Sequence, residues 1–172
     1  MDPRSNDGNI LLHDAASKGY LCVFKYLFEL LDEKNPQDYK GTMPIHRAAK
    51  KGHFEVFKFI YGKSENKNPQ DNRGWLPIHH AASTGQLEIC KFIHWMENGN
   101  NLNPLTNDGT TPLTIAASNG HFEVSRFIFG VVKHNLTAAQ KTEVFTTIKS
   151  QISDTAMSKL IVSNRSLMSI LE

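Results

Sequence analysis

The chain has 172 residues, of which 40% are hydrophobic and 21% charged, and this balance is typical of a folded globular chain rather than a disordered one. Its 19 basic and 17 acidic residues leave a formal net charge of +2. So small an excess argues against nucleic acid or an anionic membrane surface, and we expect neither as a partner. The amino terminus is polar and lacks the apolar stretch of a secretion signal, which predicts a cytoplasmic or nuclear protein.

A repeat of 33 to 35 residues runs along most of the chain. Two sets of glycines and one set of Ala-Ala pairs share this period. The first glycine set is Gly8, Gly41, Gly74 and Gly109, the second is Gly19, Gly52, Gly85 and Gly120, and the pairs begin at Ala15, Ala48, Ala81 and Ala116. Because three independent markers have one spacing, the sequence predicts four copies of one structural unit.

Each unit has the pattern of a turn followed by two helices, most clearly in the second unit. Pro44 follows the turn that contains Gly41 and marks the start of a helix, because proline presets φ and lacks an N–H group that would be unpaired there. Gly52 suits the left-handed residue that ends this helix. The next helix, from His53, has a wide apolar face. Stacked units can bury such faces, whereas a single unit cannot.

These segments resemble the ankyrin repeat. Three of them, Met43-Pro-Ile-His46, Leu76-Pro-Ile-His79 and Thr111-Pro-Leu-Thr114, are similar to its Thr-Pro-Leu-His signature, and Gly52-His-Phe-Glu-Val56 and Gly120-His-Phe-Glu-Val124 also match the family. The resemblance covers about residues 7–132. It implies an all-α solenoid of helix-turn-helix units with β-hairpin-like turns, and the units span about 7–38, 39–71, 72–106 and 107–132.

The units depart from the family pattern at three points. The first has Leu11 where proline is expected, the third is two residues longer near Glu97, and the fourth has Thr114 in place of histidine. First and last units of an array commonly deviate, because their outer faces meet water. Leu11 is also compatible with a chain cut from a longer array, and the sequence leaves both alternatives open.

Residues 133–172 do not repeat. Thr137 and Gln140 have the spacing of a capping box, which predicts a helix over about 138–151, and Asp154 is placed to cap a second helix. We interpret this tail as a C-terminal helical cap on the last unit, whose second helix carries an apolar stripe with no fifth unit to cover it. A segment that docks a partner is the alternative.

Positions that the repeat does not fix are free to specify a partner. By resemblance to the family, they lie on the concave surface formed by the turns and the first helices. The partner-binding candidates are Tyr39, Lys40, Arg47, Lys50, Lys51, Asn72, Arg73, Trp75, His80, Ser83 and Thr84.

Two features of this surface suggest how a partner would be held. Trp75 stands at a turn tip, and tryptophan is favoured as an interface anchor, although it could instead pack on a neighbouring turn. The repeat also gathers the cations of the second and third units on one side. A charge cluster of this kind is most often a solvated face, and an acidic partner is the alternative. We therefore expect a protein-protein interaction scaffold or adaptor. The alternative is the regulatory or targeting array of a larger enzyme or channel.

The sequence carries no motif for catalysis, for a cofactor or for a metal ion. It has neither a phosphate-binding loop nor a nucleophile elbow, and its histidines, cysteines and carboxylates lack ligand spacing. We expect a monomer that is not an enzyme and that takes no cofactor, metal or small-molecule substrate. By resemblance, His13, His46 and His79 are structural and bond turn backbone. Cys22 and Cys90 are expected to be buried thiols in a reducing compartment.

Three asparagines at equivalent places before the turns allow two interpretations. Asn35, Asn68 and Asn103 resemble the asparagines that oxygen-dependent hydroxylases modify in some ankyrin proteins. Asparagine is also common in turns because it tolerates their backbone conformations. The sequence does not distinguish a modification site from a turn residue here.

Overall fold

The computed structural model describes residue 8, residues 10–98 and residues 102–151. Within these residues the regular structure is entirely helical, as the sequence predicts. The helices are α1 (Leu11–Lys18), α2 (Leu21–Leu30), α3 (Pro44–Lys51), α4 (Phe54–Lys63), α5 (Pro77–Ser83), α6 (Leu87–Met96), α7 (Pro112–Ser118), α8 (Phe122–Val132) and α9 (Ala138–Gln151). None of these helices has the length and apolarity that crossing a bilayer requires.

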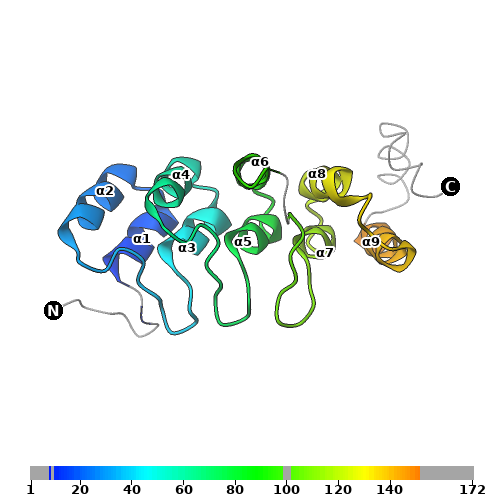
Figure 1. Cartoon of the computed structure of the whole chain (residues 1–172), viewed down its shortest axis with the longest axis horizontal. Coiled ribbons are helices and arrows are strands. Elements are labelled where there is room, and N and C mark those ends of the chain that lie inside the picture. The colour runs from blue at the N-terminus through cyan, green and yellow to red at the C-terminus, as the bar shows by residue number, and fades with distance from the viewer. Residues whose placement is uncertain (1–7, 9, 99–101, 152–172) are drawn as a thin grey trace.

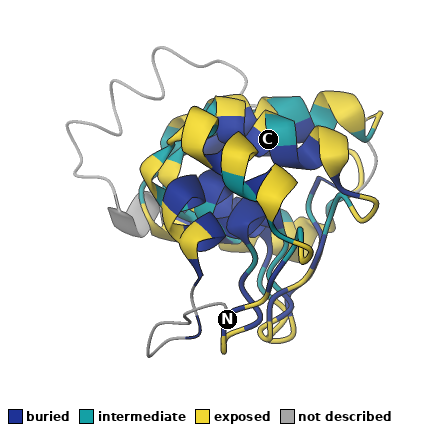
Figure 2. Cartoon of the chain, turned by 90° about the vertical axis from the view of Figure 1, so that its left-hand side faces the viewer, coloured by how far each residue is buried: buried dark blue, intermediate teal, exposed yellow. Residues whose placement is uncertain are grey.

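The helices form two rows (Figure 1). The inner row is α1, α3, α5, α7 and α9, and the outer row is α2, α4, α6 and α8, with each helix packed against the next of its row. The loops before α3, α5 and α7 project from the inner row on the same side. Seen end-on, the buried residues lie between the two rows and the exposed ones surround them (Figure 2). The candidate surface therefore lies on the turns and the inner row.

The first helix of each internal unit begins as its sequence predicts. Met43 caps α3, Pro44 is its first residue, and the Met43 amide donates to Nδ1 of His46 at 3.0 Å. The helix ends at Gly52, which has a left-handed φ of 75°. The Ala-Ala pairs of the inner row, such as Ala48 and its neighbour, are 0% exposed, because their small side chains let adjacent helices approach closely.

Aromatic rings join successive outer helices. Phe59 of α4 stands edge-on to Phe24 and Phe28 of α2, with ring centroids 6.0 and 5.5 Å apart. Phe92 of α6 makes the same contact with Tyr61 of α4 at 5.4 Å. Edge-to-face pairs of this kind contribute about 0.5–1.5 kcal/mol each beyond the area that they bury. Each of these outer helices thus packs one ring against the aromatic face of the helix before it.

The tail helix α9 has the predicted bounds and the predicted cap. The Thr137 amide donates to Oε1 of Gln140 at 2.9 Å, and the Gln140 amide donates to Oγ1 of Thr137 at 3.2 Å. Its main contact is with α7 rather than α8. Phe127, on the α8 stripe that the tail was expected to cover, instead faces His94 of α6 at 5.6 Å. The second helix predicted from Asp154 lies outside the described residues.

Candidate functional site

The turn of the second unit is built around the buried carboxylate of Asp38. Its Oδ1 accepts the amides of Lys40 and Thr42, both at 2.8 Å, and its Oδ2 accepts Nη2 of Arg47 at 2.8 Å. Burial alone would raise the pKa of Asp38, but the amide hydrogen bonds and the Arg47 guanidinium hold that pKa below its usual value. The carboxylate therefore stays ionised and fixes Arg47 against the turn.

The turn of the third unit repeats this design with Asp71. Its Oδ1 accepts the amides of Arg73 and Trp75, both at 2.9 Å, and its Oδ2 accepts Nε2 of His80 at 3.2 Å. Burial opposes ionisation, yet the His80 and amide hydrogen bonds hold the pKa of Asp71 below its usual value. The pKa of His80 is also lowered, because burial disfavours the imidazolium more strongly than Asp71 favours it. His80 is therefore a neutral donor in the place that Arg47 occupies in the second unit.

Asn72 ties the third turn to the second. Its backbone N–H donates to the Lys40 carbonyl at 3.0 Å, and its Nδ2 donates to the Tyr39 carbonyl at 3.2 Å. A Cβ on Gly41, whose φ is 71°, would collide with Oδ1 of Asn72, so glycine is needed both for the backbone conformation and for the close approach. Asn107 makes the equivalent pair of bonds from the fourth turn to the third. The turns therefore hold one another in place.

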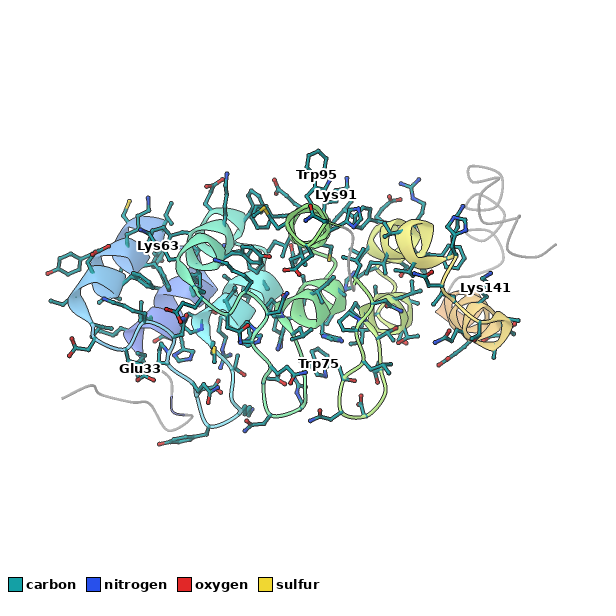
Figure 3. The ribbon with its side chains drawn as sticks, in the orientation of Figure 1. Glu33, Lys63, Trp75, Lys91, Trp95 and Lys141 are labelled. Carbon is teal, nitrogen blue, oxygen red and sulfur yellow. The ribbon has the colours of Figure 1, made fainter. Side chains whose placement is uncertain are left out.

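Trp75 supports Arg73 instead of standing free at the turn tip. Its indole is half-buried, and the guanidinium carbon of Arg73 lies 4.2 Å from a ring centroid of the indole. The ring of His80 packs edge-on to the indole at 5.2 Å. Figure 3 shows Trp75 beside α5 on the side of the turns. The indole packs within its own unit and gives Arg73 a cation–π platform, and a direct contact of Trp75 with a partner stays a prediction.

A groove of about 450 Å³ lies between the second and third turns and the helices behind them. The residues that line this basic groove are Tyr39, Lys40, Thr42, His46, Arg47, Lys50, Asn72, Arg73 and His80. The carboxylates beside it face inward, since the side chains of Asp38 and Asp71 are 1% exposed, whereas that of Arg73 is 61% exposed. Lys40 and Lys50 are exposed as well. The groove therefore presents positive charge to a partner.

The structure gathers seven of the eleven predicted partner-binding residues along the basic groove and places Lys51, Trp75, Ser83 and Thr84 outside it. The Ser83 hydroxyl donates to the His80 carbonyl at 2.8 Å, and the Thr84 hydroxyl donates to the Lys50 carbonyl at 2.7 Å, so both serve the backbone. The prediction for His80 needs correction. Its ring lies beside the groove but is 4% exposed and bonded within the chain, which makes it a support for the turn.

The histidines that the resemblance assigns to the fold are structural. Nε2 of His46 donates to the Pro69 carbonyl at 2.9 Å, and Nε2 of His79 donates to the Pro104 carbonyl at 3.1 Å, so each ring ties its helix to the segment that leads out of its own unit into the next turn. Nε2 of His13 donates instead to the Thr42 carbonyl of the second turn at 2.9 Å. Burial lowers the pKa of His46 and of His79 to about 4. Throughout the described part of the chain, no group of three histidines, cysteines or carboxylates is placed to hold a metal ion.

The two cysteines differ in their surroundings. Cys90 is buried, which raises the pKa of its thiol to about 12 and makes it unreactive. Cys22 is exposed, so the expectation that both thiols are buried is wrong. The repeat period could have predicted this exposure, because Cys22 corresponds to Glu55, Glu88 and Glu123, which lie on the solvent side of the outer helices.

The asparagines before the turns have structural hydrogen bonds. Nδ2 of Asn68 donates to Oε1 of Glu97 at 2.9 Å, and Oδ1 of Asn103 accepts the Leu113 amide at 3.0 Å in the first turn of α7. These hydrogen bonds give both asparagines a structural role. Hydroxylation of Asn68, Asn103 or Asn35 stays a prediction.

Sequence reasoning missed two residues that organise the groove. Asp38 and Asp71 are 33 residues apart, and each precedes its turn glycine by three positions, so the repeat held a usable signal. It also missed Trp95, which is 80% exposed at the end of α6. Figure 3 places Trp95 on the outer row, remote from the turns.

Comparison with known families places the fold among described repeats. The family model for ankyrin repeats (three copies) matches residues 1–71 and 45–138. These ranges together contain every residue of the basic groove. A search of curated proteins found no match to the chain.

Proposed function

The chain belongs to the ankyrin repeat family, and on that premise we propose that it is an interaction scaffold or adaptor that holds a partner protein on its turns and inner helices. Repeats of this family serve generally as protein-protein interaction modules. The observation that carries the proposal for this chain is the basic groove, whose cations are exposed while their counter-charges are buried. We propose no catalytic activity.

The partner is proposed to be an acidic segment of a protein. Arg47 and Arg73 are held in place by Asp38 and Asp71, so little further order is lost when a carboxylate binds their planar donors. Lys40 and Lys50 are exposed beside them and can steer an acidic segment toward the groove.

The charge pattern along the array limits where this segment lies. Asp14 of the first unit corresponds to Arg47 of the second, and Asp108 of the fourth unit corresponds to Arg73 of the third. Both aspartates are exposed, so the cationic centre is flanked by negative charge on each side. An acidic segment should therefore lie across the second and third units.

The organisation of the chain and its location belong to the same proposal. We infer four units at about 7–38, 39–71, 72–106 and 107–132, with residues 133–172 as a cap, and the packing of α9 against α7 supports this division. We also propose a cytoplasmic or nuclear location. The exposed thiol of Cys22 fits such a location, because free thiols persist in reducing compartments.

Affinity capture with matched variants tests the proposal. The baits are the native chain, the groove variant Lys40→Glu/Lys50→Glu and the control variant Lys58→Glu/Lys91→Glu, which makes the same charge change at exposed lysines of the outer row. Quantitative mass spectrometry then compares the proteins retained by the three baits.

We expect proteins with acidic segments to be retained by the native chain and by the control variant but lost from the groove variant. An identical retained set for all three baits would contradict the groove as the binding site. Equal losses from both variants would show that only the net charge matters. Circular dichroism of each bait confirms that it is folded.

A further inference from the structure

The first outer helix carries an exposed apolar stripe. Tyr20, Val23, Tyr26 and Leu30 are 57%, 47%, 68% and 64% exposed. They recur every three to four residues, so they lie on one side of α2. Figure 2 looks onto the end of the array to which α2 belongs. So large a stripe needs explanation, because apolar patches of several hundred Å² on soluble proteins usually mark interaction sites.

Part of this stripe is buried at the equivalent positions of the later units, although Lys63 and Met96, which correspond to Leu30, are exposed. Val23 corresponds to Val56, Ile89 and Val124, each of which is 1% exposed. Leu11, at the start of α1, is 54% exposed, whereas the prolines at its position in the later units are buried. A terminal unit that faces water usually has a polar outer side. At Leu11, Val23 and Tyr26 the first unit instead has apolar side chains where internal units make contacts.

Tyr26 is the exposed member of the aromatic series that joins the outer helices. It corresponds to Phe59, which packs edge-on against Phe24 and Phe28 of the preceding helix, and to Phe92 of α6. The ring of Tyr26 therefore stands where the fold elsewhere places a ring that contacts another helix. The occupant that suits it is a helix with its own apolar and aromatic stripe.

The α8 end of a second copy offers no accessible site for the Tyr26 ring. The positions on α8 that correspond to Phe24 and Phe28 are Ser125 and Phe129, and they are 2% and 9% exposed. Head-to-tail stacking of copies would need those side chains to be free. The accessible surface with matching chemistry is the α2 stripe of the second copy itself.

We propose that two copies of this chain associate by pairing their α2 stripes about a two-fold axis. Such a pair joins the same patch of both copies, which is the commonest symmetry of soluble oligomers. An antiparallel pair also brings Lys18, before α2, toward Asp32, after α2 of the other copy, and these charges are opposite. The proposal replaces the sequence-based expectation of a monomer and does not depend on the proposed function.

The exposed area fits a weak dimer. The four stripe residues and Leu11 offer on the order of 500 Å² per copy, given 150–250 Å² for a whole aromatic side chain. Two copies would bury about 1,000 Å², which is near the lower limit of specific interfaces. An interface this small favours weak association that depends on protein concentration. The turns project from the inner row, away from α2, so the dimer would display two basic grooves.

Sedimentation equilibrium of the full chain, between about 1 and 200 µM, tests the proposal. Tyr26→Lys and Leu30→Lys should each weaken association at least tenfold, because a lysine in the stripe would be desolvated without a partner. Tyr39→Lys is the matched control, since Tyr39 is also a tyrosine that is 68% exposed but lies in the second turn. This control should associate as the native chain does.

If the native chain stays monomeric over the whole range, the proposal is overturned. The stripe would then be expected to bind a helix pair outside this sequence. Association that Tyr26→Lys and Leu30→Lys leave unchanged would also overturn it, as would equal weakening by Tyr39→Lys. All three substituted residues are exposed, so thermal melts should match that of the native chain and show that folding is intact.

Discussion

Buried histidines show how single residues fix the segments that connect the units. His46 and His79 each accept a backbone amide at the start of their own helix and donate to a carbonyl of the segment that leads into the next turn. Both bonds require the neutral ring, with its proton on Nε2. Burial enforces that state, since the pKa of each ring falls from 6.5 to about 4. These connecting hydrogen bonds therefore depend on pH.

We predict that acid weakens the fold below pH 6.5. The two rings have a lower pKa in the native chain than in the unfolded one, so the unfolded chain binds protons first as the pH falls. Their contribution is complete above pH 6.5 and is lost toward pH 4, which amounts to about 2 kcal/mol per ring at pH 5, at 1.36 kcal/mol per pKa unit. Urea unfolding at about pH 7.5 and 5 measures the difference, which His79→Asn should reduce. An undiminished difference in that variant would refute the assignment.

At the scale of the element, α9 behaves as a further inner helix. It continues the inner row by packing against α7, and its reciprocal Thr137–Gln140 cap fixes where it begins. An array end exposes a face that internal units bury, and a covering helix limits that exposure. Stability at this end should therefore depend on α9, whereas the basic groove, two units away, should not.

Deleting residues 133–172 should lower the melting temperature by several degrees and reduce solubility, because one side of α7 becomes exposed. Each kcal/mol lost corresponds to about 2–4 °C for a chain of this size. Thr137→Ala is a milder change, which removes the two hydrogen bonds that the threonine hydroxyl makes with Gln140 and should cost about 1 kcal/mol. Differential scanning calorimetry compares the two, and binding at the groove should survive both. An unchanged melt after the deletion would favour the docking-segment alternative.

The whole molecule separates its charged surface from its apolar one. The basic groove lies on the turn side of the second and third units, and the α2 stripe lies in the outer row of the first. Contacts in a repeat array are made mainly between neighbouring units, so one surface can change with little effect on the other. Binding of an acidic partner and self-association should accordingly respond to different substitutions.

Binding kinetics should separate groove residues that affect the association rate from residues that affect the dissociation rate. Lys40→Glu/Lys50→Glu should mainly slow association and flatten its salt dependence, because exposed charges at the rim act on the encounter. Trp75→Ala should mainly speed dissociation, by about fivefold for a loss of about 1 kcal/mol, since Arg73 loses its cation–π platform. Surface-based kinetics against a captured partner, at low and high salt, distinguish the two. If neither variant alters either rate, the partner binds elsewhere.

The period, the helix starts and the cap of α9 were predictable from the sequence because they depend on short-range chemistry. Proline at the first position of a helix, glycine at positive φ and the Thr137–Gln140 spacing act within a few residues of the chain. The same period located most of the basic groove, since it places equivalent residues on one side. These features need no knowledge of which units touch.

Only the tertiary structure decided which side chains are presented. His80 and Trp75 look like surface residues by their place in the repeat. In the structure His80 hydrogen-bonds Asp71 and Trp75 packs against Arg73, so both side chains lie against the turn. Val23 looks like a core residue by its place, yet it is exposed because no described helix packs on its side of α2. Burial depends on atoms about 33 residues away and on whether a neighbour is present. A local pattern specifies neither, so the exposure of these residues follows from packing between units.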